Sequence, residues 1–313
     1  MKQVLVTGGT GFIGSNLCRS LIERGERVVC VDNNSTGSER NIASFRQRPN
    51  FVFREFDVTM PLPEDIGSID VVYHLASPAS PVQYQKHPIE TLLVNTIGTK
   101  YLLDFARKHN ARFLFASTSE VYGDPAVHPQ PETYWGHVNS IGPRSCYDEG
   151  KRAGEAFVYS YCEKFNIDAR IVRLFNTYGP NMEINDGRVI SNFIVQALKN
   201  EPITIYGDGM QTRSFCYILD IIAGLTLLME KPDMKGEVVN LGNPDERTIL
   251  EIAEKVKSMT VSSSPIVYKQ LPIDDPKKRC PDITKARNLL GWTPRINLNT
   301  GLQETIAYFR SVV

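Results

Sequence analysis

The sequence shows no excess of charge of either sign, because 35 Lys and Arg residues balance 35 Asp and Glu residues. A chain without a net positive field offers little general attraction to nucleic acid or to an acidic membrane surface, so neither is expected as a partner. It also has no apolar run of the roughly 18 residues that a membrane helix needs, and no signal-peptide pattern. We therefore expect a soluble protein without a membrane anchor.

Closely spaced cysteines are also missing. The six cysteines lie at positions 18, 30, 146, 162, 216 and 280, so no Cys-x-x-Cys pair is available for a metal or a redox site. The five histidines are scattered as well, and we predict no metal. Cysteines in this pattern are typical of reduced thiols, which indicates a cytoplasmic protein.

Alternating strand and helix patterns fill the first half of the 313-residue chain. Short apolar runs read as buried strands, and amphipathic helical patterns separate them, which predicts a parallel, doubly wound Rossmann sheet of the α/β class. A helix is expected over 89–109, and Ser77–Pro81, with two prolines, is expected to be a loop. The predicted strands cover residues 2–7, 27–31, 51–56, 70–76, 111–116 and 168–174.

The first predicted strand leads directly into a glycine-rich turn and a helix that reaches about Arg24. Gly8, Gly11 and Gly14 form a G-x-x-G-x-x-G pattern in the strand-turn-helix context that binds a dinucleotide pyrophosphate at the helix N-terminus. No Gly-Lys-Ser/Thr follows, which argues against a triphosphate-binding loop. The second strand ends in Asp32, where a carboxylate can accept hydrogen bonds from an adenosine ribose. A 2′-phosphate would meet its negative charge, so NAD is favoured over NADP.

Tyr147 and Lys151 lie four residues apart, which places both side chains on one helix face. The lysine charge could lower the pKa of the phenol and leave a base that works near neutral pH. An isolated pair of this kind is more often an exposed helix face. Thr118, at a strand end, could meet the Tyr147 hydroxyl across a substrate alcohol, although capping of the strand end is the simpler role for it.

These residues together resemble the extended short-chain dehydrogenase/reductase superfamily of nucleotide-sugar enzymes. Longer stretches are similar to its UDP-glucuronate decarboxylases, over nearly the whole chain. Two positions depart from that pattern, since this chain has Leu93 where a lysine is common and Asn181 where an arginine is common. The stretches that carry the resemblance are His74–Pro81, Ser117–Asp124, Tyr134–Asn139, Gly142–Arg152, Phe175–Pro180 and Asn185–Val189.

The resemblance implies a decarboxylase that oxidises carbon 4 of UDP-glucuronate with NAD, loses carbon dioxide from the resulting β-keto acid, and takes the hydride back to give UDP-xylose. The implied catalytic residues are Tyr147, Lys151, Thr118, Ser119, Glu120 and Arg213, with Glu120 or a water that it positions returning a proton to carbon 5. The implied UDP-sugar contacts are Asn176, Arg188, Asn192, Tyr206, Gln211, Arg213 and Arg279. With the strand ends, the predicted NAD-binding set is Gly8, Gly11, Phe12, Ile13, Gly14, Asp32, Asn33, Asn34, Ser35, Thr36, Gly37, Asp57, Val58, Leu75, Ala76, Ser77, Ala116, Tyr147, Lys151 and Thr177.

Two domains are expected: an NAD-binding Rossmann domain over 1–174, and a smaller α/β substrate-binding lobe over 175–313 with segments that cross back to the sheet. Helices are predicted at 188–199, 219–230, 248–258 and 298–311. The resemblance also implies a homodimer. Three other functions stay open. A UDP-sugar 4-epimerase needs the same Tyr and Lys but no Glu120, a nucleotide-sugar 4,6-dehydratase usually has an Asp-Glu pair where this chain has Ser119-Glu120, and a non-enzymatic NAD-binding regulator would tend to lose the Tyr or the Lys.

Overall fold

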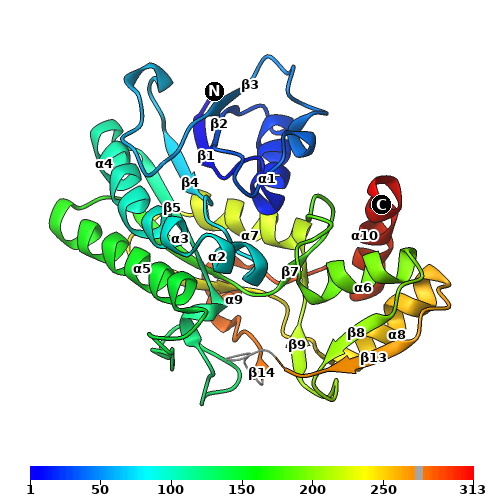
Figure 1. The fold of residues 1–313 in the computed structure, drawn as a ribbon. Helices are drawn as coiled ribbons and strands as arrows, with labels where there is room; N and C mark the ends of the chain where they lie inside the picture. Colours follow the sequence, from blue (N-terminus) through cyan, green and yellow to red (C-terminus); the bar gives the residue numbers. More distant parts are fainter. Residues whose placement is uncertain (272–277) are drawn as a thin grey trace.

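The core of the molecule is a seven-stranded, fully parallel sheet (Figure 1). The computed structural model describes residues 1–271 and 278–313. The strands are β1 (Gln3–Thr7), β2 (Arg27–Asp32), β3 (Phe51–Glu55), β4 (Val71–His74), β5 (Arg112–Thr118), β6 (Ala169–Leu174) and β11 (Val238–Leu241). Their spatial order is β11-β6-β5-β4-β1-β2-β3, and every neighbouring pair is parallel. The order reverses between β1 and β4, where ligands of such sheets bind.

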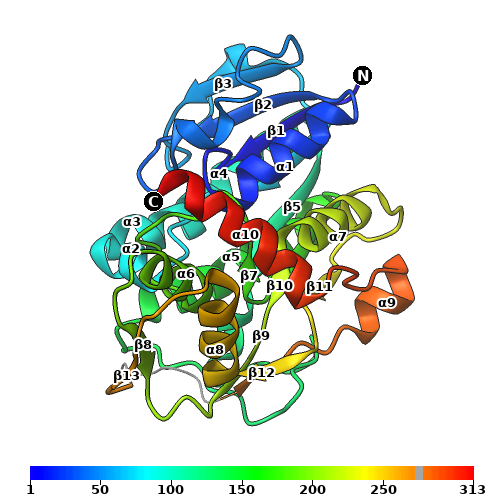
Figure 2. The ribbon, with the colours of Figure 1, turned by 90° about the vertical axis from the view of Figure 1, so that its right-hand side faces the viewer.

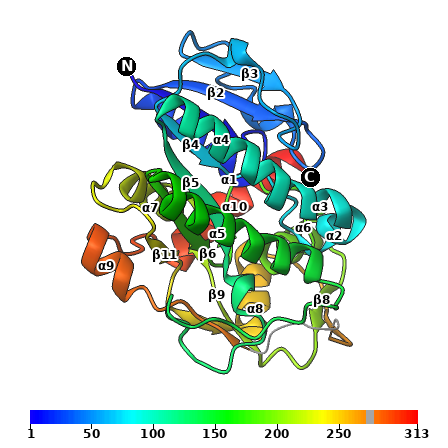
Figure 3. The same ribbon diagram turned by 90° about the vertical axis from the view of Figure 1, so that its left-hand side faces the viewer.

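Helices cover both faces of this sheet, which explains why its strands are apolar on both sides. Side chains alternate along β1: Val4 and Val6 join one core cluster, and Leu5 joins the other. On the first face lie α1 (Phe12–Glu23) and α7 (Ile218–Glu230), in front of the sheet in Figure 2. On the second lie α4 (Thr99–His109) and α5 (Ser145–Phe165), in front in Figure 3. The predicted doubly wound α/β fold is confirmed.

The rest of the second half forms a smaller group of helices and short sheets beside the carboxyl ends of the main strands (Figure 1). Strand pairs β7–β10 and β8–β13 are parallel, and β9 lies between β12 and β14. The elements are β7 (Thr177–Tyr178), α6 (Val189–Leu198), β8 (Ile203–Tyr206), β9 (Thr212–Ser214), β10 (Cys216–Tyr217), β12 (Glu246–Thr248), α8 (Ile249–Thr260), β13 (Ile266–Lys269), β14 (Lys278–Arg279), α9 (Thr284–Leu290) and α10 (Leu298–Val312).

The chain after β4 differs from the expected loop and single helix. Pro81 opens a short helix, α2 (Pro81–Lys86), because proline suits the first helical turn. The long helix is divided into α3 (Pro88–Leu93), a π-helical turn η3 (Val94–Gly98) and α4. The Asn95 amide, within the π-helical turn, donates to the Thr91 carbonyl of α3 at 2.8 Å, so a side chain enters the backbone bonding where the helix is irregular. The remaining short helices are η1 (Glu39–Ile42), η2 (Glu64–Ile66) and η4 (Ser119–Tyr122).

Two elements from beyond residue 174 belong spatially to the main sheet. β11 pairs with β6 at its edge, and α7 packs against α1. A division of function at residue 174 stays a prediction. No helix among the described residues combines the length and the apolar character that a membrane crossing requires.

Candidate active site

A cleft of about 710 Å³ runs along the carboxyl ends of the main strands. Residues from the ends of β1, β2, β4, β5 and β6 line it on one side, and residues of the smaller lobe line it on the other. The structure brings to this cleft every residue of the predicted catalytic, cofactor and substrate sets except Asn34 and Gly37.

The glycine turn leaves no room for side chains where the chain passes from β1 to α1. A Cβ on Gly14 would lie 2.0 Å from the Gly8 carbonyl oxygen. Gly8 has φ +73°, and a Cβ there would lie 2.7 Å from the Ala76 backbone nitrogen. Helix α1 begins after Gly11 without a side-chain cap, so its first amides remain available for an anion. This cradle fits a dinucleotide pyrophosphate.

Asp32 is held by main-chain groups. Its Oδ2 accepts from the Thr10 amide and its Oδ1 from the Asn34 amide, both at 2.9 Å. Each oxygen keeps a second lone pair for a ribose hydroxyl. Asn34 itself adopts a left-handed conformation, and its Oδ1 accepts from the Thr10 hydroxyl at 3.0 Å. A Cβ on Gly37 would lie 2.1 Å from that same hydroxyl, so Asn34 and Gly37 shape the loop from behind.

Tyr147 and Lys151 are both buried on α5, at 6% and 3% exposure. Burial lowers the pKa of Lys151 to about 7, and its Nζ donates to the Ala116 carbonyl at 2.7 Å. The phenol's pKa is not lowered towards neutral as the pair predicted, and the part of Lys151 in lowering it stays a prediction; its Nζ lies 5.8 Å from the centre of the Tyr147 ring. Burial raises the pKa of Tyr147, and the groups that lower it are the hydrogen-bonding Thr118 side chain and the Arg188 charge.

Thr118 ends β5 and begins the short helix that carries Glu120. Its Oγ1 accepts from the Glu120 amide at 3.2 Å, so the capping role and the position in the cleft coexist. The Glu120 carboxylate is ion-paired with Arg144 through one oxygen and with Arg279 through the other. Burial would raise the pKa of Glu120, but Arg279 and Arg144 lower it to about 2. Glu120 is therefore an ionised acid inside an arginine clamp.

The far end of the cleft carries the predicted UDP-sugar residues. Arg213 on β9 lies opposite Arg279 on β14 in the strand register, and both are buried. The Arg279 Nη1 also donates to the Ser119 hydroxyl at 3.4 Å. Arg188 forms a two-pronged pair with Asp186, whose Oδ2 accepts from Nη2 at 2.7 Å. The other predicted UDP-sugar residues, Asn176, Asn192, Tyr206 and Gln211, also line the cleft.

Three functional candidates escaped the sequence reasoning. Arg144 lines the cleft three residues before Tyr147, within the recognised Gly142–Arg152 stretch, which was the available signal. Tyr84 of α2 stacks on Tyr147, with ring centroids 5.0 Å apart and planes 6° apart. Asp148 is buried, and its Oδ1 has no hydrogen-bond partner among the residues that the structure describes. Burial, followed by the charge of Glu120, raises the pKa of Asp148 to about 7.

The two departures from the family pattern have different settings. Leu93 lies at the cleft and is 42% exposed. Asn181 has φ +73°, a conformation that asparagine tolerates better than most residues. Its amide donates to the Ser15 hydroxyl of α1 at 3.0 Å. Asn181 thus joins the smaller lobe to the helix of the glycine turn.

Comparison with known proteins places these features in a family context. The model of the NAD dependent epimerase/dehydratase family matches residues 4–242. UDP-glucuronic acid decarboxylase 1 of Danio rerio is 51% identical over 98% of this chain and 72% of its own length. UDP-glucuronic acid decarboxylase 2 of Arabidopsis thaliana is 50% identical over 99% of this chain and 69% of its own.

Solved structures show the same architecture. UDP-glucuronic acid 4-epimerase from Bacillus cereus, in complex with UDP-glucuronic acid and NAD, has a TM-score of 0.90 at 31% identity, covering 99% of this chain and all of the other. UDP-glucose 4-epimerase from Thermotoga maritima, with UDP-glucose, has a TM-score of 0.89 at 32% identity, covering 99% of each chain.

Proposed function

This chain belongs to the NAD dependent epimerase/dehydratase family, and we propose that it decarboxylates UDP-glucuronate to UDP-xylose through a 4-keto intermediate. The observation that carries the proposal is the arginine clamp on Glu120, directly beside Thr118 and Tyr147. Tyrosine and threonine serve any carbon 4 oxidation in this fold. A clamped acid beside them provides for a second step at carbon 5.

The order of steps follows from the stability of carbanions. A sugar carboxylate on carbon 5 cannot leave as carbon dioxide while carbon 4 is an alcohol, because the remaining electron pair has no acceptor. A ketone at carbon 4 turns the substrate into a β-keto acid. The carbon–carbon bond can then break with its electrons passing into an enolate. Reduction of the ketone restores the alcohol, so the cycle is redox-neutral.

The cofactor end of the cleft fits NAD. When bound, NAD accepts the hydride from carbon 4 and returns it after carbon dioxide has left. The glycine turn and the first amides of α1 would hold the pyrophosphate, and Asp32 would accept from the adenosine ribose. Lys151, whose Nζ already lies at the Ala116 carbonyl, would hold the nicotinamide ribose.

Tyr147 takes the proton of the carbon 4 hydroxyl. Burial raises its pKa, so deprotonation depends on the partners that favour the phenolate, of which Thr118 is the hydrogen-bonding one. Thr118 then donates to the oxygen of carbon 4 as negative charge develops there in the enolate. Ser119, next to Thr118, orients the sugar ring. Tyr147 returns its proton when carbon 4 becomes an alcohol again.

Glu120 is a poor proton donor in this setting, because Arg279 and Arg144 hold its pKa at about 2. Of the two routes for returning a proton to carbon 5, the structure favours a water that the Glu120 carboxylate orients. The enolate carbon takes the proton and the resulting hydroxide is neutralised by bulk solvent. Arg213 and Arg279 are placed to bind the UDP pyrophosphate, for which planar guanidinium groups are well suited.

Incubation of the protein with UDP-glucuronate tests the function directly. We expect carbon dioxide and UDP-xylose in equal amounts, with no net accumulation of NADH. Interconversion of UDP-glucuronate with its carbon 4 epimer, without carbon dioxide, would overturn the decarboxylase assignment in favour of an epimerase. Turnover of dTDP-glucose would indicate a 4,6-dehydratase, and NAD binding without turnover of any sugar nucleotide would indicate a regulatory protein.

The epimerase is the best-supported second candidate, since both solved structures described above are 4-epimerases. Their identities of 31% and 32% are well below the 51% and 50% of the decarboxylases. This difference, together with the clamped Glu120, favours decarboxylation.

We further propose a homodimer in a reducing, cytoplasmic compartment. All six cysteines are free and buried, although Cys18 and Cys30 lie close enough to hydrogen-bond. Helices α3 and α5 pack together and leave Ile89 and Tyr159 61% and 62% exposed, a surface that a second copy could cover. Light scattering of the wild type and of Ile89→Glu tests the dimer: a wild-type monomer would overturn it.

A further inference from the structure

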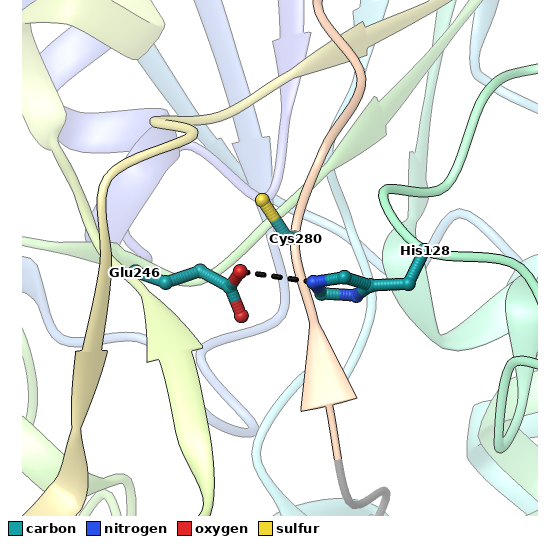
Figure 4. Close-up of side chains that lie close together, drawn as sticks. All are labelled: His128, Glu246 and Cys280. Carbon is teal, nitrogen blue, oxygen red and sulfur yellow. Dashed lines mark hydrogen bonds and ion pairs between the residues drawn. The ribbon is translucent and has the colours of Figure 1, made fainter.

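Outside the cleft, three side chains with metal-binding atoms meet between loops that are far apart in the sequence. His128 lies in the segment after η4, Glu246 begins β12, and Cys280 follows β14 directly. One ligand atom from each residue lies within 4.8 Å of the others (Figure 4). None of the three lines the active-site cleft.

The atoms are those that zinc binds in proteins: an imidazole nitrogen, a carboxylate oxygen and a cysteine sulfur. Around a tetrahedral zinc ion with bonds of about 2.0–2.3 Å, ligand atoms lie roughly 3.3–3.8 Å apart. His128 Nε2 lies 2.9 Å from Glu246 Oε2, and the wider separations in the cluster stay below 4.8 Å. Small side-chain rotations therefore suffice to surround an ion, which would replace the histidine–glutamate hydrogen bond.

Neighbouring groups already orient these ligands. The Thr212 hydroxyl donates to Glu246 Oε1 at 2.8 Å, which leaves Oε2 facing His128. Gln130, which is fully buried, accepts through Oε1 from the Cys280 amide at 2.9 Å. The backbone N–H of Gln130 donates to the Cys280 carbonyl, also at 2.9 Å. Hydrogen bonds from neighbouring residues to the ligands are typical of metal sites, where they fix the direction of each ligand.

The site is both closed and reachable. Cys280 is 2% exposed, whereas the side chains of His128 and Glu246 are 31% and 28% exposed. An ion can enter from the histidine and glutamate side and reach the buried sulfur, and a water can complete the coordination.

We propose that His128, Glu246 and Cys280 bind one zinc ion. Its role is structural, because the ion joins the segment between η4 and α5 to two segments of the smaller lobe and does not face the cleft. β12 pairs with β9, which carries Arg213, and Cys280 follows Arg279. The zinc ion would therefore stabilise the strands that carry both cleft arginines. The expectation of no metal came from spacing along the chain, and the fold brings these ligands together over 152 positions between His128 and Cys280.

Cobalt and zinc titrations of the intact protein test the proposal after removal of adventitious metal with a chelator. We expect cobalt(II) to bind one equivalent and to give a thiolate-to-cobalt charge-transfer band, which zinc abolishes by competition. Zinc at about 100 times its Kd should raise the thermal unfolding midpoint by at least about 4 °C. Absence of saturable binding of both ions would overturn the site and leave a histidine–glutamate hydrogen bond beside a buried thiol.

Variants locate the bound ion. Cys280→Ser should remove the charge-transfer band and weaken zinc binding at least tenfold, and Glu246→Gln should weaken binding while keeping the band. Cys162→Ser, which removes another buried thiol from α5, should change neither. Unchanged binding in both Cys280→Ser and Glu246→Gln would contradict the proposal. Glu246→Gln decides the matter alone if Cys280→Ser does not fold, because Glu246 is partly exposed.

Discussion

The two ends of the cleft are built in different ways. At the cofactor end, main-chain groups shape the site: two backbone amides donate to Asp32, and the glycines of one turn leave space for a pyrophosphate. At the substrate end, charged side chains hold one another, and Glu120 takes its ionised state from two arginines. The part of the first end that faces the pyrophosphate and the adenosine ribose is assembled within some 30 residues of sequence, whereas the second end joins the end of β5 to a strand near residue 279.

Because of this difference, the cofactor end is suited to holding a bound molecule and the substrate end to the chemical steps. A cradle of backbone amides is rigid once the strand and helix are folded, and so it suits a cofactor that stays bound through the cycle. Side-chain ion pairs can exchange partners when a charged substrate arrives. The substrate end is therefore the part of the cleft where a carboxylate can be received, reacted and released.

Replacing Tyr147, which lies where the cofactor end and the substrate end meet, should have the largest effect on turnover. Tyr147→Phe removes the base but preserves the ring that stacks on Tyr84, so kcat should fall by about 10³-fold. NAD retention and the affinity for the UDP-sugar should both persist, which turnover and binding assays measure separately. Tyr268→Phe, on β13 and 55% exposed outside the cleft, is the matched control. Near-normal turnover of Tyr147→Phe would exclude it as the base.

Gly14→Ala should break the cofactor end alone. The added Cβ would lie 2.0 Å from the Gly8 carbonyl oxygen, which is backbone and can only move by opening the turn. We expect the Kd for NAD to rise by about 100-fold, measured by calorimetry on the cofactor-stripped protein. Gly25→Ala controls for stability, since its Cβ meets nothing within 4 Å and only the φ of +81° costs about 1 kcal/mol. Tight NAD binding by Gly14→Ala would show that the cradle is not needed.

Glu120→Gln should break the substrate end alone. A neutral amide cannot balance Arg144 and Arg279, which keep their charges and lose the ionised group that positions water. We expect kcat for decarboxylation to fall by about 30-fold with an unchanged Kd for NAD. Glu149→Gln, which disturbs only a surface pair with Arg152, should behave like the wild type. A large change in NAD affinity in Glu120→Gln would contradict the independence of the two ends.

The smallest expected effect is on the pH dependence of stability. The pKa of Glu120 is lowered from 4.5 to about 2 in the folded protein. Its ionised form therefore stabilises the fold above about pH 4.5, and this contribution is lost as the pH falls towards 2. The difference in unfolding free energy between wild type and Glu120→Gln should shrink over this window, as followed by urea denaturation. A difference in unfolding free energy that stays constant over this pH range would indicate that Arg144 and Arg279 do not control the ionisation of Glu120.

The sequence predicted the cofactor end better than the substrate end, for a physical reason. Glycines, a strand-end carboxylate and a strand-to-helix turn act through nearby backbone, so their pattern is visible in a short window. The Arg144–Glu120–Arg279 clamp depends on how distant loops meet, and no local pattern encodes it. The family membership that the motifs indicated is confirmed by the family model and by the decarboxylase relatives.

Three local predictions that the structure contradicts also failed because they depend on contacts that a short stretch of sequence does not show. Pro81 occupies the first turn of a helix, where its fixed φ is favourable, so the proline segment forms α2 rather than a loop. The π-helical turn at Val94–Gly98 interrupts a continuous helical pattern because side chains there bond to the backbone. The direction of the Tyr147 pKa depends on burial, which four-residue spacing does not report.

The seventh strand of the sheet also bears on how the protein is made. β11 pairs with β6, yet about 64 residues of sequence separate Leu174 from Val238. A ribosome that has just released β6 has delivered six strands, and the β6 edge is still without its partner β11. An unpaired edge strand is a template for wrong pairing. That edge closes only when the chain has passed Leu241. The first elements of the smaller lobe, from β7 to β10, are thus synthesised while the nascent Rossmann sheet is unfinished, so the sheet is completed only after part of its neighbour exists.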